Sequence, residues 1–304
     1  MVRKRAFFIL IICLCLVLLF PSLTKTAAAE NNSMIIINKA TNKLAFFDEG
    51  QVVKVFDVAT GRKMTYTPEG TFTVLKKIKN RPYYKKNIPG GSPNNPLGDR
   101  WLGLSVPGTW GNVYGIHGNN NESSIGKYIS DGCVRMHNDD VRWLFDQIST
   151  GIQVVIVNEK KDFEDLAKEN GYELKLPEII KGNKNVTIFL DKELFTKPSR
   201  YSNSFGAMIS SPQVVKVFEE TDTGFYHIRT WLGDAWITKE ATVVGELNQV
   251  EKKLVLTKQT TLYTRPNGAY SGEVSPQTVK AFEQVGSWYH IFTWFGDAWI
   301  NVKN

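Results

Sequence analysis

The chain is poor in cysteine and has little excess charge. Two of its three cysteines, Cys13 and Cys15, lie in an apolar run near the N-terminus, so the rest of the chain keeps only Cys133 and has no internal disulfide. The formal net charge is +7, but residues 1–29 contain four basic side chains and no acidic one. The remaining chain has 33 Lys and Arg against 30 Asp and Glu, and this mild excess predicts no nucleic-acid partner.

The N-terminal apolar run is too short for an ordinary membrane span. It covers 15 residues, 6–20, whereas a spanning helix needs about 20. Basic residues precede the run and Ala27-Ala28-Ala29 follows it, which is the layout of a secretory signal peptide. We therefore predict a signal peptide over residues 1–29 and a secreted, extracytoplasmic protein. The membrane is a partner only if this segment stays uncleaved as an anchor.

The rest of the chain is long enough for more than one domain. From residue 34 it reads as strands, with β-branched and aromatic runs over 34–37, 44–47 and 52–59 separated by turn signals. Residues 80–111 are rich in Pro, Gly and Asn, which predicts a long surface loop without regular elements. Long loops on a rigid scaffold often carry function.

One clear helix is predicted after Cys133. Asn138 is a candidate cap, and the apolar side chains that follow fall on one helical face: Val141, Leu144, Phe145 and Ile148. An apolar strand over 152–157 follows, and then a charged stretch with Gly and Pro. We expect a first domain over residues 34–158 and a linker with a short helix over residues 159–184.

An internal repeat fills the C-terminal part. Ser-Pro-Gln at 211–213 recurs at 275–277, and Gly-Asp-Ala-Trp-Ile at 233–237 recurs at 296–300. The spacing predicts repeat one over residues 185–240 and repeat two over residues 252–304, each of a size that folds alone as a small β-barrel.

The two repeats resemble bacterial Src-homology-3-like domains. That resemblance implies binding to a cell-wall polymer. From their residue types alone, we expect the four repeat tryptophans to be core residues more often than ligand contacts, and the paired His227 and His290 to be structural. The four tryptophans are Trp231, Trp236, Trp294 and Trp299.

The lone cysteine of the first domain lies in a segment suited to nucleophilic catalysis. The sequence reads YGIHG over residues 114–118 and, after a polar loop, SDGCVRM over residues 130–136. A thiol attacks as the thiolate, and with an ordinary pKa of about 8.5 it needs a base or positive potential nearby. His117 is the candidate base. Gly132 leaves room for an acyl group and for backbone N–H donors, and Arg135 supplies positive charge.

These two segments resemble the catalytic motif of the L,D-transpeptidases of the YkuD type. The resemblance covers residues 34–158. Further matches to the family pattern are YTPEGTF at 66–72, NPLG at 95–98 and NDDV at 138–141. The family implies a β-sandwich-like catalytic domain, so the predicted fold class is mainly β: this domain with one clear helix, then the two Src-homology-3-like β-barrels.

The resemblance also implies an activity on peptidoglycan stem peptides. Cys133 would attack the carbonyl of the third stem residue, His117 would take the thiol proton, D-alanine would leave, and the amine of a second stem would resolve the thioester. Water as the acceptor would make the enzyme a carboxypeptidase instead. No cofactor and no metal are implied. The positions expected to form the oxyanion hole or bind substrate are Asp131, Gly132, Arg135, Gly118 and Ser130.

The chain departs from the family at one position. Members usually have histidine directly before the Gly-Cys pair, whereas this chain has Asp131. An anion beside the thiol is expected to raise the thiol pKa. The rival hypothesis is therefore a non-catalytic wall-binding protein. A zinc site that includes His137 matches no closed ligand spacing, a papain-like site does not fit the local signature, and an inert buried cysteine stays open as the plain structural alternative.

Overall fold

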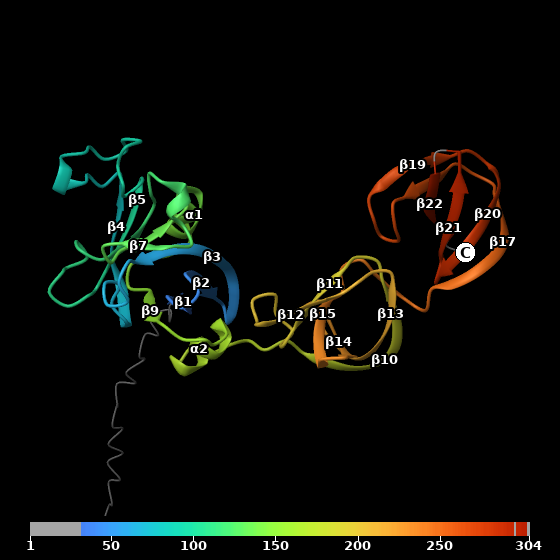
Figure 1. The fold of residues 1–304 in the computed structure, drawn as a ribbon, viewed down its shortest axis with the longest axis horizontal. Coiled ribbons are helices and arrows are strands. Elements are labelled where there is room, and N and C mark those ends of the chain that lie inside the picture. Colours follow the sequence, from blue (N-terminus) through green and yellow to red (C-terminus); the bar gives the residue numbers. More distant parts are fainter. Residues whose placement is uncertain (1–31, 295, 303–304) are drawn as a thin grey trace, which may run out of the picture. The chain divides into compact units, whose positions relative to one another are not determined.

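The computed structural model describes residues 32–294 and 296–302 (Figure 1). The predicted signal peptide, residues 1–29, lies outside the described residues. The described part contains 22 β-strands and two α-helices, so the prediction of a mainly β chain is confirmed. None of its helices combines the length and apolar character that a membrane span requires.

The first domain is a closed set of strands. The strand order is β2-β1-β9-β4-β5-β6-β8-β3-β7, and β2 also pairs with β3, so the series closes on itself around a core of aliphatic and aromatic side chains. The strands are β1 Ser33–Asn38, β2 Lys43–Asp48, β3 Gln51–Gly61, β4 Gly70–Lys79, β5 Arg100–Leu104, β6 Gly115–His117, β7 Tyr128–Ser130, β8 Val134–Met136 and β9 Gln153–Val157.

Strand β1 is buried on both faces, which explains its unbroken apolar run. Side chains alternate along a strand, so Ile35 and Ile37 point into the main core whereas Ile36 points the other way. Helix α2, Phe163–Glu169, covers that second face with Phe163 and Leu166. The helix therefore extends the first domain beyond its last strand.

Helix α1, Asn138–Gln147, confirms the predicted helix. Val141, Leu144 and Phe145 are buried on one face, and the helix contacts β5 and β6. The capping role expected for Asn138 is wrong. Asn138 is the first helical residue and its side chain bonds the backbone of Asn119 in a neighbouring loop instead.

The prediction that residues 80–111 lack regular elements is also wrong. Strand β5 lies within this stretch, and a short 3₁₀ helix, Tyr84–Lys86, precedes it; a second, Glu122–Ser124, lies further along the chain. Trp101, Leu102 and Leu104 are buried because β5 pairs with β4 on one side and β6 on the other. Pairing on both sides outweighs the turn-forming residues around it.

The stretch expected as a linker, residues 159–184, has two structural parts. Helix α2 packs on β1, and strand β10, Ile179–Ile188, begins before residue 184. Strand β10 pairs with β13, Gln213–Thr221, so its first residues belong to the sheet of the first repeat.

The two repeats share one topology. The first sheet runs β12-β11-β15-β14-β13-β10-β16 and the second runs β19-β18-β22-β21-β20-β17, so six strands match in the same order. Besides β10 and β13, the first repeat has β11 Lys192–Phe195, β12 Ser204–Ile209, β14 Phe225–Thr230, β15 Gly233–Thr238 and β16 Thr242–Val244. The second repeat has β17 Asn248–Leu256, β18 Thr260–Tyr263, β19 Tyr270–Val274, β20 Gln277–Val285, β21 Trp288–Thr293 and β22 Gly296–Asn301.

The repeat tryptophans divide into two kinds. Trp236 and Trp299 are buried, at 6% and 5% exposure, as expected for core residues. Trp231 and Trp294 lie at the turn before β15 and β22 and are 66% and 73% exposed, so the expectation that they pack in the core is wrong.

The paired histidines have equivalent contacts. His227 stacks on Trp236 and bonds Glu219, and His290 stacks on Trp299 and bonds the matching glutamate, Glu283. Their contacts lie within each repeat, in keeping with a structural role.

Candidate active site

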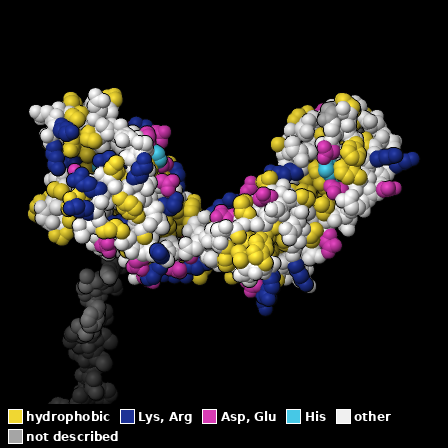
Figure 2. Space-filling view, viewed as in Figure 1, with side chains coloured by type: hydrophobic (Ala, Val, Ile, Leu, Met, Phe, Trp, Pro, Cys, Tyr) yellow, Lys and Arg dark blue, Asp and Glu magenta, His cyan; other side chains and the backbone are white. Residues whose placement is uncertain are grey.

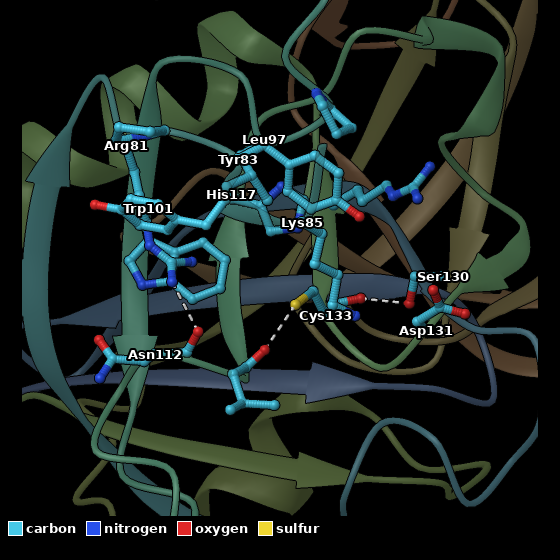
Figure 3. Close-up of a pocket in the computed structure, with 15 residues that line it drawn as sticks. Arg81, Tyr83, Lys85, Leu97, Trp101, Asn112, His117, Ser130, Asp131 and Cys133 are labelled. Carbon is cyan, nitrogen blue, oxygen red and sulfur yellow. Dashed lines mark hydrogen bonds between the residues drawn. The ribbon is translucent and has the colours of Figure 1, made fainter. Parts of the chain in front are cut away.

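A cavity of about 250 Å³ opens beside β6 and β8 of the first domain (Figure 3). The segment 81–85 and the turn before β6 form much of its wall. Five of the seven predicted site residues line it: Cys133, His117, Asp131, Arg135 and Ser130. Gly118 and Gly132 do not line the cavity, so any role they have is through the backbone.

Cys133 lies between β7 and β8 and is half-buried. Its Sγ donates a hydrogen bond to the carbonyl oxygen of Val113 at 3.2 Å, which Figure 3 marks. Burial raises the pKa of the thiol, whereas a backbone hydrogen bond at Gly115 and the positive charges of Arg81 and Arg135 lower it. Burial is the largest of these effects, so the free protein holds a neutral thiol at pH 7.

Hydrogen bonds fix the turn that presents the thiol. Ser130 Oγ donates to the carbonyl of Cys133 at 2.6 Å and accepts the N–H of Gly132 at 3.0 Å, and Thr67 Oγ1 donates to the Gly132 carbonyl at 3.0 Å. Gly132 has φ +129°, and a Cβ there would lie 2.6 Å from the Tyr66 carbonyl oxygen. Only glycine fits this position without a shift of backbone.

These bonds correct the expected oxyanion hole. The N–H of Gly132 is engaged by Ser130, so it does not point freely at a reacting carbonyl. Ser130 stabilises this turn, because its oxygen bonds the backbone N–H of Gly132 and the backbone carbonyl of Cys133. The N–H groups of Asp131 and Cys133 are the remaining donors of the predicted set.

His117 is held as a neutral imidazole. It ends β6, is 3% exposed, and its Nδ1 lies 2.6 Å from the carbonyl oxygen of Gly118. That carbonyl accepts a hydrogen bond from the Nδ1–H group, and in this tautomer Nε2 is the unprotonated nitrogen. The pKa of His117 is lowered to about 4: burial lowers it most, the nearby cations Arg135 and Arg81 add to this, and the backbone hydrogen bond to Gly118 opposes them.

Gly118 supports the histidine through close packing. A Cβ on Gly118 would collide with the side chain of Asn138, and it would lie 3.2 Å from the Cα of Gly98. The same Asn138 side chain accepts the N–H of Asn119 at 3.0 Å and donates to its carbonyl at 2.9 Å. The backbone oxygen that orients His117 is thus fixed by this contact.

Asp131 does not act on the thiol as expected. Its carboxylate forms a 2.8 Å ion pair with Arg62, and both side chains are exposed. The thiol pKa is raised, but burial raises it, and Asp131 is not among the leading causes. The neighbouring cation and the surrounding water screen the negative charge.

The comparisons with known proteins concern this first domain. The family model of the L,D-transpeptidase catalytic domain, YkuD, matches residues 32–157. The Bacillus subtilis protein YqjB, named as a proposed L,D-transpeptidase, is 49% identical over 145 residues, which are 48% of this chain and 82% of that protein. The chain belongs to the L,D-transpeptidase family.

Other similar proteins match to different shares of their own length. The Bacillus licheniformis protein YkuD, also named as a proposed L,D-transpeptidase, is 40% identical over 113 residues, 37% of this chain and 58% of that protein. The solution structure of the E. faecium L,D-transpeptidase catalytic domain is 21% identical with a TM-score of 0.32, covering 42% of this chain and 98% of that one.

Some cavity residues of this family member were missed from sequence. Arg81 lies with its guanidinium 4.0 Å from the centre of the Trp101 ring, and its Nη2 donates to the Asn112 carbonyl at 2.8 Å. Together with Lys85 and Arg135 it makes three cations in the cavity wall. The only sequence signal for Arg81 and Lys85 was the long loop in which they lie, because nothing local to them indicates that they line the cavity.

His137 and the metal site that would include it were the remaining candidates. The ring of His137 bonds the carboxylate of Glu122 and does not line the cavity, so it replaces no catalytic group. Across the described ranges, no cluster of three or more His, Cys, Asp or Glu side chains is arranged to hold a metal ion.

Figure 2 shows basic side chains interleaved with apolar ones on the visible face of the first domain.

The lowered pKa of His117 predicts a pH-dependent stability. The unfolded chain binds this proton near pH 6.5, whereas the folded protein binds it only near pH 4. The neutral buried ring therefore contributes stability that is present above pH 6.5 and is lost as the pH falls toward 4, on the order of 3 kcal/mol. Urea unfolding at several pH values measures it: His117→Gln removes this dependence, and the exposed-site control His137→Gln keeps it. The prediction is contradicted if the free energy of unfolding depends on pH equally in the wild type and in His117→Gln.

The ion pair of Asp131 predicts that removing its charge changes the thiol little. In Asp131→Asn, the pKa of Cys133, measured from the pH dependence of iodoacetamide alkylation at this residue, shifts by less than about half a unit. In Arg135→Gln the same pKa rises, because a cation that favours the thiolate is lost. A large fall in the pKa of Cys133 in Asp131→Asn would show that the carboxylate does suppress the thiolate.

Proposed function

We propose that this protein is an exported peptidoglycan L,D-transpeptidase that cross-links stem peptides through a Cys133 thioester. The observation that carries the proposal is that Cys133 and the neutral base His117 line one cavity with three cations, in a chain of this family. A half-buried thiol that shares a cavity with a neutral imidazole and positive charge suits acyl transfer to sulfur.

Acylation uses the two groups in sequence. As Sγ of Cys133 attacks the carbonyl carbon that joins the third stem residue to the terminal D-residue, Nε2 of His117 takes the thiol proton. The raised pKa of the thiol and the low pKa of the imidazole mean that proton transfer accompanies attack, with no preformed ion pair. The carbon–nitrogen bond then breaks, His117 returns the proton to the leaving amine, and D-alanine departs from the thioester.

Deacylation runs the same path with a new nucleophile. The side-chain amine of a second stem attacks the thioester carbonyl, and His117 takes a proton from that amine and returns it to the departing sulfur. The new amide joins two third-position residues. Water in place of the amine would release a shortened stem and make the protein a carboxypeptidase.

The cations of the cavity suit an anionic peptide. Arg81, Lys85 and Arg135 present positive charge to the space in front of Cys133, and a stem peptide carries free carboxylates. We assign Arg135 to a substrate carboxylate, as the motif implies. The same charges favour the thiolate and the oxyanion as these form.

The repeats are proposed to hold the enzyme on the cell wall. Each one exposes a tryptophan at the same turn, Trp231 in the first and Trp294 in the second. An exposed aromatic ring kept in both copies suits contact with a ligand. Export through residues 1–29 would place the protein at the wall, where tethering raises the local concentration of stems.

An acyl-enzyme is the direct test of the catalytic proposal. Intact-protein mass spectrometry after incubation with a tetrapeptide muropeptide is expected to show a thioester adduct on the wild type and none on Cys133→Ala. His117→Gln is expected to acylate about a hundredfold more slowly, since the general base is lost.

The soluble products of that experiment identify the acceptor. Cross-linked stems establish the transpeptidase, and shortened stems without cross-links establish the carboxypeptidase. A folded wild type that gives neither adduct nor product contradicts the catalytic proposal and leaves the wall-binding protein.

Wall binding is tested by sedimentation with insoluble peptidoglycan. Deletion of residues 178–304, which removes β10 with the rest of the repeats, is expected to abolish sedimentation while acylation of soluble stems persists. Substituting both Trp231→Ala and Trp294→Ala is expected to weaken binding about tenfold. The control Trp110→Ala, a similarly exposed tryptophan of the first domain, is expected to bind as wild type. Unchanged sedimentation of the deletion variant would remove the targeting role.

A further inference from the structure

Trp101 is a buried aromatic residue in contact with the candidate base. It lies on β5 directly opposite His117 on β6, and it is 1% exposed. The two rings stack with their centres 5.4 Å apart and an interplanar angle of 16°. Because one face of the imidazole lies against the indole, Trp101 limits both the rotation of His117 and its access to water.

Two glycines leave room for this indole. A Cβ on Gly115, in the neighbouring strand, would lie 2.7 Å from Cζ2 of Trp101. A Cβ on Gly103 would lie 2.9 Å from its Nε1 and would collide with the carbonyl of Gly111. Side chains at either position would displace the ring or the segment beside it, so the local sequence is built around the tryptophan.

The polar edge of the same ring reaches the segment that contacts the thiol. Nε1 of Trp101 donates a buried hydrogen bond to the Gly111 carbonyl at 3.0 Å. Two residues later, the Val113 carbonyl accepts the hydrogen bond of Cys133 Sγ at 3.2 Å. The segment 111–113 therefore connects the indole to the nucleophile.

Arg81 adds a second tie to this segment. Its guanidinium lies 4.0 Å from the indole centre, and its Nη2 donates to the carbonyl of Asn112. A cation on an aromatic face is attracted by the ring quadrupole, so the indole also holds Arg81 over the cavity. Trp101 thus contacts the base, the segment that contacts the nucleophile, and a cation that acts on both.

We propose that Trp101 is a positioning residue that sets the geometry of His117 through its ring face and that of Cys133 through its Nε1 hydrogen bond. The inference deepens the proposed acyl-transfer function and assigns no chemical step to the tryptophan. The ring stacking and the Nε1 hydrogen bond of Trp101 can be removed by different substitutions, so the proposal can be tested without the substrate.

Trp101→Phe keeps an aromatic face and removes the Nε1 donor. The segment 111–113 is then less firmly held, so the Val113 carbonyl no longer fixes the protonated thiol. Because the protonated form loses this hydrogen bond, the pKa of Cys133 is expected to fall by about half a unit or more. The measurement is iodoacetamide alkylation against pH, read at Cys133 by peptide mass spectrometry on the full chain. The pKa of His117, read by NMR of ¹³C-labelled histidine, is expected to stay near 4.

Trp101→Leu removes the ring face as well. The imidazole then gains water, and its pKa is expected to rise by about one unit or more toward 6.5, with Arg81 and Arg135 still opposing protonation. Trp143→Phe is the matched control: this tryptophan packs on Phe46 and Phe56 in the same domain, and its loss is expected to move neither titration.

The outcomes separate this inference from the proposed function. If folded Trp101→Phe and Trp101→Leu titrate at both residues as wild type does, the positioning role is overturned; should Trp101→Leu not fold, Trp101→Phe and the thiol titration decide it. Where the wild type acylates with muropeptide, Trp101→Phe is expected to lose about tenfold in turnover despite its more reactive thiol. A wild type that fails to acylate contradicts the proposed function and leaves the titrations valid.

Discussion

Burial of the His117 imidazole is the constraint on which the chemistry of this site depends. With a pKa of about 4, the ring is neutral at pH 7, and its Nδ1 is bonded to the Gly118 carbonyl. The same protein interior raises the pKa of the Cys133 thiol, so the resting site holds two neutral groups and no ion pair. In the proposed mechanism, such a site keeps its thiol protonated until an acyl group arrives. Reactivity toward other electrophiles is thereby limited, since the thiolate is the nucleophilic form.

The sequence predicted that His117 and Cys133 lie together, because each belongs to a short, contiguous motif. His117 and Cys133 are each recognised by their immediate neighbours, and both line the cavity. It could not predict which residues complete the cavity wall. Arg81 and Trp101 reach the site through strand pairing and loop closure, which join residues distant in the chain. Nor could it predict that the N–H of Gly132 is engaged by Ser130, since that bond depends on how the turn closes.

The fold shows the same division between local and distant information. The helix after the cysteine follows from its apolar spacing, and the repeats follow from recurring residues, so α1 and the matched strand orders were accessible from sequence. Strand β5 was not, because its neighbours signal turns and only pairing with β4 and β6 makes it a strand. Burial of the repeat tryptophans could not be assigned by type either: a residue inside a strand and one at the turn before it are chemically identical but meet different surroundings.

Net charge gives no account of the electrostatics of this site. The chain beyond residue 29 has nearly balanced charges, yet Arg81, Lys85 and Arg135 share one cavity wall. The potential at a thiol depends on the few charges within several ångströms and on how much water separates them, so a small local excess outweighs the total. Asp131 is a charge that water screens from the thiol. It lies in the thiol loop and in the cavity wall, but its carboxylate is exposed to water and pairs with Arg62, which screens its charge from the sulfur. Under the proposed function, the carboxylate that departs from the family pattern is paired with Arg62, while the three cations of the cavity wall stay available to an anionic substrate.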